Sequence, residues 1–285
     1  MRLLSVAQGL LSEMTTAKAL SSMTSCGREL GRNARFMAHL CVTFELSCGC
    51  SVGCPICALS AGRLEGVFRH TRENAALWRD VLARLHDVVG DAAGAGCCYY
   101  ATEPLDNPDY ELFLQDFLEE FGRVPQTTTA SAARDIERTR ALLRWGQGAY
   151  PHFDRISVLD ERDLATLLES FTPEELVFTD LLPQFPGASF FNLTKAGRQQ
   201  DEDDGVEGTI ACASGFVVNM WERSVRLVTP AVADAEHPTG EIVYEKAGFS
   251  GAAGLEDAVR QMVDRHMNET ISLASLFTQK GSARA

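Results

Sequence analysis

Residues 38–57 read AHLCVTFELSCGCSVGCPIC and join a predicted strand to a cysteine-rich loop. Residues 38–46 are rich in β-branched and aromatic side chains, which favours a buried strand. Four of the chain's nine cysteines follow within ten residues, and three of them, Cys50, Cys54 and Cys57, have the spacing CxxxCxxC. Three thiolates on so short a loop can converge on one metal centre, and a set of three leaves a coordination position open.

Strand and helix patterns alternate about five times along the chain from this first strand. The expected strands cover residues 38–46, 97–104, 123–130, 153–160 and 176–182, and the expected helices cover 73–89, 107–121, 131–145 and 161–171. Their spacing suits right-handed crossovers between parallel strands. The alternation stops near Pro186, well short of an eight-unit barrel. It therefore predicts an α/β fold with a partial (β/α)6 TIM-like barrel.

Local signals mark the starts of two of these segments. Asn107 and Pro108 have the residue types of an N-cap and a first-turn proline, which predicts that a helix begins there. Thr172 and Glu175 have capping-box spacing and open a short turn before the fifth strand.

The segments on either side of the barrel pattern differ from it in character. Residues 1–35 predict an N-terminal extension of short helices, residues 36–198 the partial barrel, and residues 199–285 a C-terminal β-rich substrate cap. Within the cap we expect a hairpin over 209–228 with Trp221-Glu222-Arg223 at its turn. A strand over 241–244 and an amphipathic helix over 255–267 complete the predicted cap.

The charge balance narrows the class of partner. The chain carries 26 basic and 39 acidic residues, a formal net charge of −13. Nucleic acids and anionic membrane surfaces are bound by clustered Lys and Arg, so we expect neither as a partner. No stretch approaches the roughly 20 apolar residues of a membrane span. No convincing cleavage site follows the short apolar run at residues 1–11, so we expect a cytoplasmic protein.

The cysteine loop is open to three interpretations on its residues alone. A catalytic metal site uses three ligands and an open position. A structural zinc site would add Cys48 as a fourth ligand and make the chain a zinc-binding interaction protein, although such sites usually pair two well-separated Cys-x-x-Cys knuckles. An electron carrier fits less well, because no protein side chain is evident as the fourth ligand.

At this point the chain resembles the radical S-adenosylmethionine (radical SAM) superfamily. In that superfamily a CxxxCxxC loop follows the first strand of a partial barrel, and the residue before the third cysteine is hydrophobic, here Ile56. A Gly-Gly-Glu-Pro-like turn follows the second strand. The matching place here reads Ala101-Thr102-Glu103-Pro104, with both glycines replaced, and Asn107-Pro108 stands downstream as the resemblance requires.

The resemblance implies a complete set of cofactors. Cys50, Cys54 and Cys57 would each ligate one iron of a single 4Fe-4S cluster, and S-adenosyl-L-methionine would chelate the fourth iron. Reductive cleavage of that molecule would yield a 5′-deoxyadenosyl radical, with flavodoxin or ferredoxin as electron donor.

The same resemblance assigns further contacts to S-adenosylmethionine. Ile56 belongs to the cofactor-binding set, and the turn of Thr102, Glu103 and Pro104 would hold the ammonium group. Ser157 would contact the ribose or the carboxylate by its position, and an ordinary strand serine explains it equally well. The threonines at 127–129 could also line the pocket, and strand propensity is an equal explanation for them.

One cysteine downstream of the barrel pattern has a candidate role. Cys212 is the single cysteine beyond Cys98, which excludes an auxiliary cluster held by several C-terminal cysteines. Some radical SAM epimerases return a hydrogen atom to the substrate from one thiol, and Cys212 is the candidate donor. A buried apolar cysteine is the simpler alternative.

The expected substrate is a peptide natural-product precursor. Residues 215–230 resemble the C-terminal part of radical SAM proteins that mature ribosomally made peptides. We expect epimerisation or another C–H modification, with a separate precursor-recognition protein, because the 35 residues before the barrel are too few for a recognition domain. The alternative is a small-molecule sugar, nucleoside or amino acid in biosynthesis.

Overall fold

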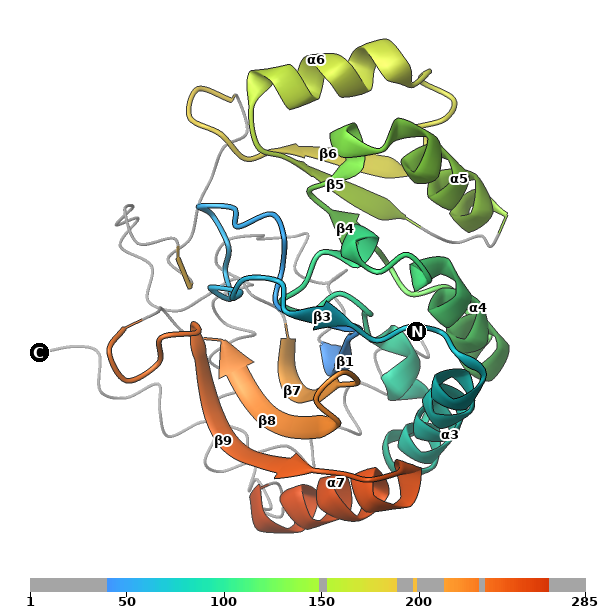
Figure 1. Ribbon diagram of the computed structural model, residues 1–285, viewed down its shortest axis with the longest axis vertical. Helices are drawn as coiled ribbons and strands as arrows, with labels where there is room; N and C mark the ends of the chain where they lie inside the picture. The colour runs from blue at the N-terminus through green and yellow to red at the C-terminus, as the bar shows by residue number, and fades with distance from the viewer. Residues whose placement is uncertain (1–39, 149–152, 189–196, 199–212, 231–233, 267–285) are drawn as a thin grey trace, which may run out of the picture.

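The computed structural model describes residues 40–148, 153–188, 197–198, 213–230 and 234–266 (Figure 1). Its main strands are β1 (Leu40–Glu45), β4 (Thr128–Thr129), β5 (Asp154–Val158), β6 (Thr179–Pro183), β7 (Ala213–Asn219), β8 (Ser224–Pro230) and β9 (Glu241–Gly248). The short strands β2 (Ser47–Cys48) and β3 (Gly66–Val67) flank the cysteine loop. The α-helices are α3 (Arg72–Val89), α4 (Tyr110–Phe121), α5 (Ile136–Gln147), α6 (Glu161–Ser170) and α7 (Ala252–His266). Single 3-10 turns are η2 (Gly90–Ala95), η3 (Pro104–Asp106) and η4 (Ala132–Arg134).

A four-stranded sheet with the order β1-β7-β8-β9 carries the larger core. Strand β1 pairs in parallel with β7, and the strands from β7 to β9 are antiparallel. One face of this sheet presents apolar side chains such as Phe44 and Val218, which pack with Trp78 of α3 and Leu255 of α7. Both helices form because their apolar residues recur at helical spacing, and Figure 1 shows them side by side beneath the sheet.

A separate three-stranded parallel sheet, β4-β5-β6, holds the second core. Helices α5 and α6 cover one face of it (Figure 1). Ile156 and Val158 of β5 pack there with Leu143 and Leu167. Because side chains alternate along a strand, Ser157 faces the opposite side of the sheet.

The α/β class is confirmed, and the predicted partial (β/α)6 TIM-like barrel is not shown, because the described strands form separate sheets and none of these is closed. Residues 97–104, predicted as a strand, are bends and turns that make two backbone bonds with β1. Phe44 N donates to the carbonyl of Cys97, and Tyr100 N donates to the carbonyl of Phe44. A Cβ at Gly96 would lie 2.4 Å from the carbonyl oxygen of Val42, so the chain approaches β1 too closely for a regular neighbouring strand.

The predicted helix start at Asn107 is wrong. Helix α4 begins at Tyr110, with Asp109 at its N-cap position. The buried Asn107 side chain instead donates to the carbonyls of Leu46 and Phe68, at 3.0 and 2.8 Å. These bonds attach the turn before α4 to both ends of the cysteine loop.

The predicted C-terminal hairpin is confirmed in the residues described, with its turn at Trp221-Glu222-Arg223 between β7 and β8. The predicted strand at 241–244 extends to Gly248 as β9, and helix α7 covers Ala252–His266 of the described residues. Residues 1–35 lie outside the described residues. The described part of the predicted cap shares a sheet and a core with β1, which belongs to the predicted barrel segment.

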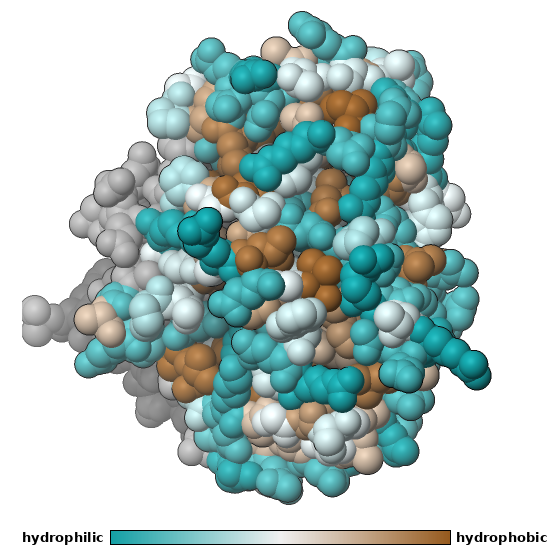
Figure 2. Space-filling view, in the orientation of Figure 1, coloured by the Kyte–Doolittle hydropathy of each residue, from teal (hydrophilic) through white to brown (hydrophobic). Residues whose placement is uncertain are grey.

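The surface in Figure 2 shows apolar side chains as separate patches divided by hydrophilic ones. Across the ranges that the structure describes, no helix combines the length and the apolar character that crossing a membrane requires.

Candidate functional site

The three cysteines of the CxxxCxxC motif lie on a loop whose neck is closed by backbone pairing. Strands β2 and β3 pair antiparallel through Ser47 with Val67 and Cys48 with Gly66. Beyond them, Cys50 N donates to the carbonyl of Gly62 at 2.9 Å. The loop is therefore a closed excursion directly after β1, as the motif predicts.

The Cys54 and Cys57 thiols form a hydrogen-bonded pair. The bond from Cys54 is the main reason why the pKa of Cys57 is lowered to about 5, and a bond of 3.3 Å from Ala61 N adds to the effect. The shared proton raises the pKa of Cys54. Such donors stabilise a thiolate, which is the form that binds metal. The thiolate form is therefore favoured at Cys57, while Cys54 holds the shared proton.

Cys50 approaches the pair from the first half of the loop. Its Sγ accepts a bond of 3.4 Å from Val52 N, and burial raises its pKa. Among the described residues, no three Cys, His, Asp or Glu side chains are grouped closely enough to hold a single metal ion. An iron–sulfur cluster is held by ligands that lie farther apart than those of a single metal ion, because each thiolate binds a different iron. The donor set fits such a cluster by chemistry: three thiols on one loop, with backbone N–H donors to two of the sulfurs.

Cys48 does not join the other three. Its thiol lies 3.7 Å from Oε2 of Glu65 and 3.8 Å from Oε1 of Glu222. Burial and these two carboxylates raise its pKa to about 11, so the neutral thiol is favoured. This geometry counts against a zinc site that uses Cys48 as its fourth ligand.

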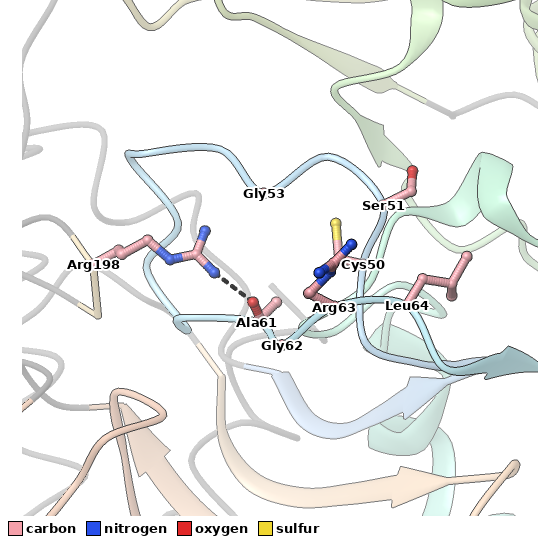
Figure 3. Close-up of a pocket in the computed structure, with 8 residues that line it drawn as sticks. All are labelled: Cys50, Ser51, Gly53, Ala61, Gly62, Arg63, Leu64 and Arg198. Carbon is pink, nitrogen blue, oxygen red and sulfur yellow. Dashed lines mark hydrogen bonds between the residues drawn. The ribbon is translucent and has the colours of Figure 1, made fainter.

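Arg198 holds the far side of the loop. Its Nη1 donates to the carbonyl of Cys54 at 2.7 Å. Its Nη2 donates to the carbonyl of Ala61, and Figure 3 draws this second bond. Its backbone N donates to the carbonyl of Cys57 at 2.9 Å. The positive charge of Arg198 adds to the lowering of the pKa of Cys57 and partly opposes the rise in the pKa of Cys54. Sequence reasoning missed this residue, because no motif marks it and it lies 144 positions from Cys54.

Gly197 allows Arg198 to lie close to the backbone of the cysteine loop. Its φ is +53°, and a Cβ there would lie 2.3 Å from the carbonyl carbon of Ala58 and 2.5 Å from the carbonyl oxygen of Cys57. Any other residue would have to displace the loop backbone. The glycine therefore sets the distance between the loop and the segment that carries Arg198.

A pocket of about 400 Å³ opens beside Cys50. The cysteine loop supplies most of its lining, and Arg198 closes one side (Figure 3). The lining residues are Cys50, Ser51, Gly53, Ala61, Gly62, Arg63, Leu64 and Arg198. Its volume is in the range of small-molecule sites.

The turn predicted to hold S-adenosylmethionine lies against this loop. Ser51 N donates to Oδ2 of Asp106 at 2.8 Å, which joins the loop to the turn of η3. Pro104 starts η3, and Thr102 N bonds to the carbonyl of Tyr99. The structure thus brings the two predicted motifs together. Asp106, whose carboxylate accepts this bond, was not among the site residues predicted from the sequence.

Glu103 is buried and its carboxylate is fully engaged. Oε1 accepts from the Thr129 hydroxyl and from Leu105 N, and Oε2 accepts from Ala130 N at 2.9 Å. Burial raises its pKa despite these donors. The carboxylate therefore attaches the turn to the end of β4.

The remaining residues predicted for the site contribute less to it in this structure. Ile56 is half-buried on the loop between Cys54 and Cys57. Ser157 is half-buried on the face of β5 away from α5 and α6. The Thr127 hydroxyl is occupied by a bond of 3.1 Å to the Tyr110 hydroxyl. Cys212 lies outside the described residues.

Comparison with known proteins gives two similarities. No family model matches the chain. The chain is 37% identical over 257 residues to the uncharacterized protein y4wI of Sinorhizobium fredii (strain NBRC 101917 / NGR234), a match that covers 86% of this chain. The match covers 50% of y4wI, so the chain spans about half the length of the curated relative it matches.

Among solved structures, the fold is similar to the crystal structure of BtrN in complex with AdoMet and 2-DOIA. The TM-score is 0.44 and the sequence identity 13%, over 65% of this chain and 70% of the BtrN chain.

Proposed function

We propose that the protein is a radical SAM enzyme, with one 4Fe-4S cluster on Cys50, Cys54 and Cys57. The observation that carries the proposal is the joint between the three-cysteine loop and the turn of residues 101–106, made by Ser51 and Asp106. In such an enzyme, S-adenosylmethionine binds the open iron of the cluster, so the turn that holds this molecule must lie next to the cysteine loop. The bond between Ser51 and Asp106 makes the loop and the turn neighbours.

The residues of the chain have distinct tasks in this assignment. The hydrogen bonds to the sulfurs of Cys50 and Cys57 favour the thiolate forms and would tune the cluster. Arg198 holds the cysteine loop in place by donating hydrogen bonds to its backbone carbonyls. The turn of Thr102, Glu103 and Pro104 would hold the ammonium group of S-adenosylmethionine.

When bound, the cluster and S-adenosylmethionine supply reductive cleavage of the sulfonium and a 5′-deoxyadenosyl radical that removes a hydrogen atom from a substrate C–H bond. The protein supplies orientation and keeps water from the reacting centre. Flavodoxin or ferredoxin is the proposed electron donor.

The proposed substrate is a peptide natural-product precursor, supported by the likeness of residues 215–230 to peptide-maturing radical SAM proteins. A separate recognition protein would present it. A sugar, nucleoside or amino acid is the alternative substrate. Deuterium uptake from heavy water into the product would support epimerisation with Cys212 as hydrogen-atom donor, whereas its absence would favour another C–H modification.

The test is anaerobic reconstitution with iron and sulfide, followed by S-adenosylmethionine and dithionite. We expect bound iron and sulfide in a four-iron cluster and release of 5′-deoxyadenosine. A variant with Cys50, Cys54 and Cys57 all changed to Ala loses both.

Cys48→Ala is the matched control, because Cys48 lies on the same loop neck but faces Glu65 and Glu222. It should keep the cluster and the cleavage activity. One tightly bound zinc ion in place of the cluster, or equal cluster assembly on the triple variant, would refute the proposal.

A further inference from the structure

Helix α5 contributes one side chain to the turn that lies against the cysteine loop. The half-buried Arg138 donates from Nη1 to the carbonyl of Leu105 at 2.8 Å and from Nη2 to the carbonyl of Asn107 at 2.6 Å. The Asn107 carbonyl also accepts a longer bond of 3.2 Å from Tyr110 N. Glu111 of α4 accepts bonds of 3.0 and 3.1 Å from Nε and Nη2 of Arg138. Arg138 therefore holds both the turn of η3 and the start of α4.

The two carbonyls that Arg138 bonds lie on either side of Asp106. Leu105 belongs to η3, and Asn107 follows η3 directly. A guanidinium is a rigid planar fork, so donation to both carbonyls fixes the backbone between them. That backbone carries Asp106, whose carboxylate accepts the bond from Ser51 N. The direction in which Asp106 points thus depends on a side chain of α5.

Arg138 also connects the turn to the second core. Leu143 of α5 packs with Ile156 of β5, so the helix is fixed on the sheet β4-β5-β6. Glu103 attaches the first half of the turn to the end of β4. Arg138 attaches the second half, next to Asp106. The turn is therefore held at both ends by the unit that carries this sheet, and at Asp106 by the cysteine loop.

We propose that Arg138 is a positioning residue for S-adenosylmethionine, which acts by orienting Asp106 toward Ser51. In this way it sets the place of the turn of residues 101–106 beside the cysteine loop. The identity of the ligand rests on the proposed function, whereas the action of Arg138 on Asp106 rests on the hydrogen bonds alone. Arg138 does not line the pocket beside Cys50, so its loss should spare cluster assembly.

Arg140 on the same helix provides a matched control. It is half-buried like Arg138, and it also bonds to carboxylates and to backbone. Its Nε donates to Glu175 at 2.8 Å, its Nη2 donates to the carbonyl of Ser170 at 2.6 Å, and its Nη1 donates to Glu137. None of these partners belongs to the turn. Lys keeps the positive charge at either position but not the planar fork, so the two Arg→Lys variants should lower Tm by similar amounts.

The first test needs neither a cluster nor S-adenosylmethionine. Ser51 is exposed, so protection of its amide hydrogen from exchange with solvent depends on the bond to Asp106. Measured by NMR on the full chain, this exchange should be roughly tenfold faster in Arg138→Lys than in wild type. In Arg140→Lys it should be unchanged. Exchange that is unchanged in Arg138→Lys, or accelerated equally in both variants, overturns the proposal.

The second test measures the Kd for S-adenosylmethionine after reconstitution with iron and sulfide. Both variants should load iron as wild type does, and Arg138→Lys alone should raise the Kd roughly tenfold. Equal Kd values in the two variants, or loss of iron from Arg138→Lys, overturn the assigned role. A wild type that binds no S-adenosylmethionine counts against the proposed function, and Ser51 exchange then still decides whether Arg138 orients Asp106.

Glu111→Gln keeps the test decisive if Arg138→Lys fails to fold. The amide retains one oxygen acceptor but loses the negative charge that holds the guanidinium in place. Ser51 exchange should again be faster than in wild type, by a smaller factor. Glu137→Gln is the control, because it removes the same charge from the exposed partner of Arg140. Ser51 exchange that is alike in these two variants overturns the proposal.

Discussion

The backbone N–H of Ser51 donates to Oδ2 of Asp106 across 55 positions of sequence, at 2.8 Å. This bond makes the cysteine loop and the turn of η3 one unit, although different parts of the chain supply them. A carboxylate acceptor strengthens such a bond relative to a neutral one. The position of the turn relative to Cys50 therefore depends on a side chain that itself holds no cofactor.

Asp106→Ala should weaken the binding of S-adenosylmethionine without preventing cluster assembly. The variant removes the acceptor of Ser51 N, so the turn is no longer fixed against the loop. We expect the Kd for S-adenosylmethionine to rise roughly tenfold, as loss of one charge-assisted bond implies. Calorimetric titration of the reconstituted protein measures it. Asp106→Asn keeps an oxygen acceptor and should lie near wild type; equal Kd values for wild type and Asp106→Ala would contradict the prediction.

Gly197→Ala should prevent cluster loading, whereas Gly53→Ala should not. Both glycines have positive φ, at +53° and +63°, so both substitutions introduce similar backbone strain of about 1–2 kcal/mol. A Cβ at Gly197 also collides with Ala58 and Cys57, while nothing lies within 4 Å of one at Gly53. Iron content after reconstitution distinguishes them. Equal loading would show that close packing at Gly197 is irrelevant to the cluster.

Asn107→Ala should destabilise the fold by about 1–3 kcal/mol, because it leaves the buried carbonyl of Phe68 without its donor and removes one of the two donors to the carbonyl of Leu46. Asn74→Ala is the matched control, since the side chain of the half-buried Asn74 makes a single bond, to the carbonyl of Arg69. It should cost less than about 1 kcal/mol. Urea denaturation gives both values, and similar losses in the two variants would refute the special role of Asn107.

The stability contributed by His86 should fall as the pH rises. A hydrogen bond with Glu120, and a second with Asp91, raise the pKa of His86 in the folded protein. The protonated ring is thus favoured by folding. Its stabilisation is fully present below the unfolded pKa of about 6.5 and is lost as the pH passes the folded value.

Because these side chains are partly exposed, we expect no more than about 1 kcal/mol from the His86 interactions. The free energy of unfolding of wild type relative to His86→Gln should decline between about pH 6 and 8. Glu120→Gln should remove most of this pH dependence. A difference that grows with pH would reverse the assigned sign.

Much of the local structure could be predicted from the sequence, because short-range patterns determine it. The stripe of apolar residues in α3 and the capping box of Thr172 and Glu175 both act within a few residues. The cysteine loop was equally visible, since its three thiols lie close in sequence. Such signals give the type of an element and its approximate bounds.

Long-range relations could not be read in the same way. No sequence motif around Arg198 indicates that its side chain donates to the carbonyls of Cys54 and Ala61. Asn107 has a good N-cap residue type, but tertiary packing uses its amide between Leu46 and Phe68 instead. The ion pair of Arg226 with Glu45 is hidden for the same reason, because these residues are 181 positions apart and meet only once β1, β7 and β8 have paired.

The pairing of β1 with β7 also orders events during synthesis. Glu45 and Asn219, which bond across this pair, are 174 positions apart. At about 5–20 residues per second, the ribosome needs roughly 10–35 s to add the partner of β1. Until then one edge of β1 is open, and an open edge invites pairing with other chains. Arg198 reaches the cysteine loop only near the end of the same interval, so iron delivered earlier would meet the three thiols on a loop that lacks its support.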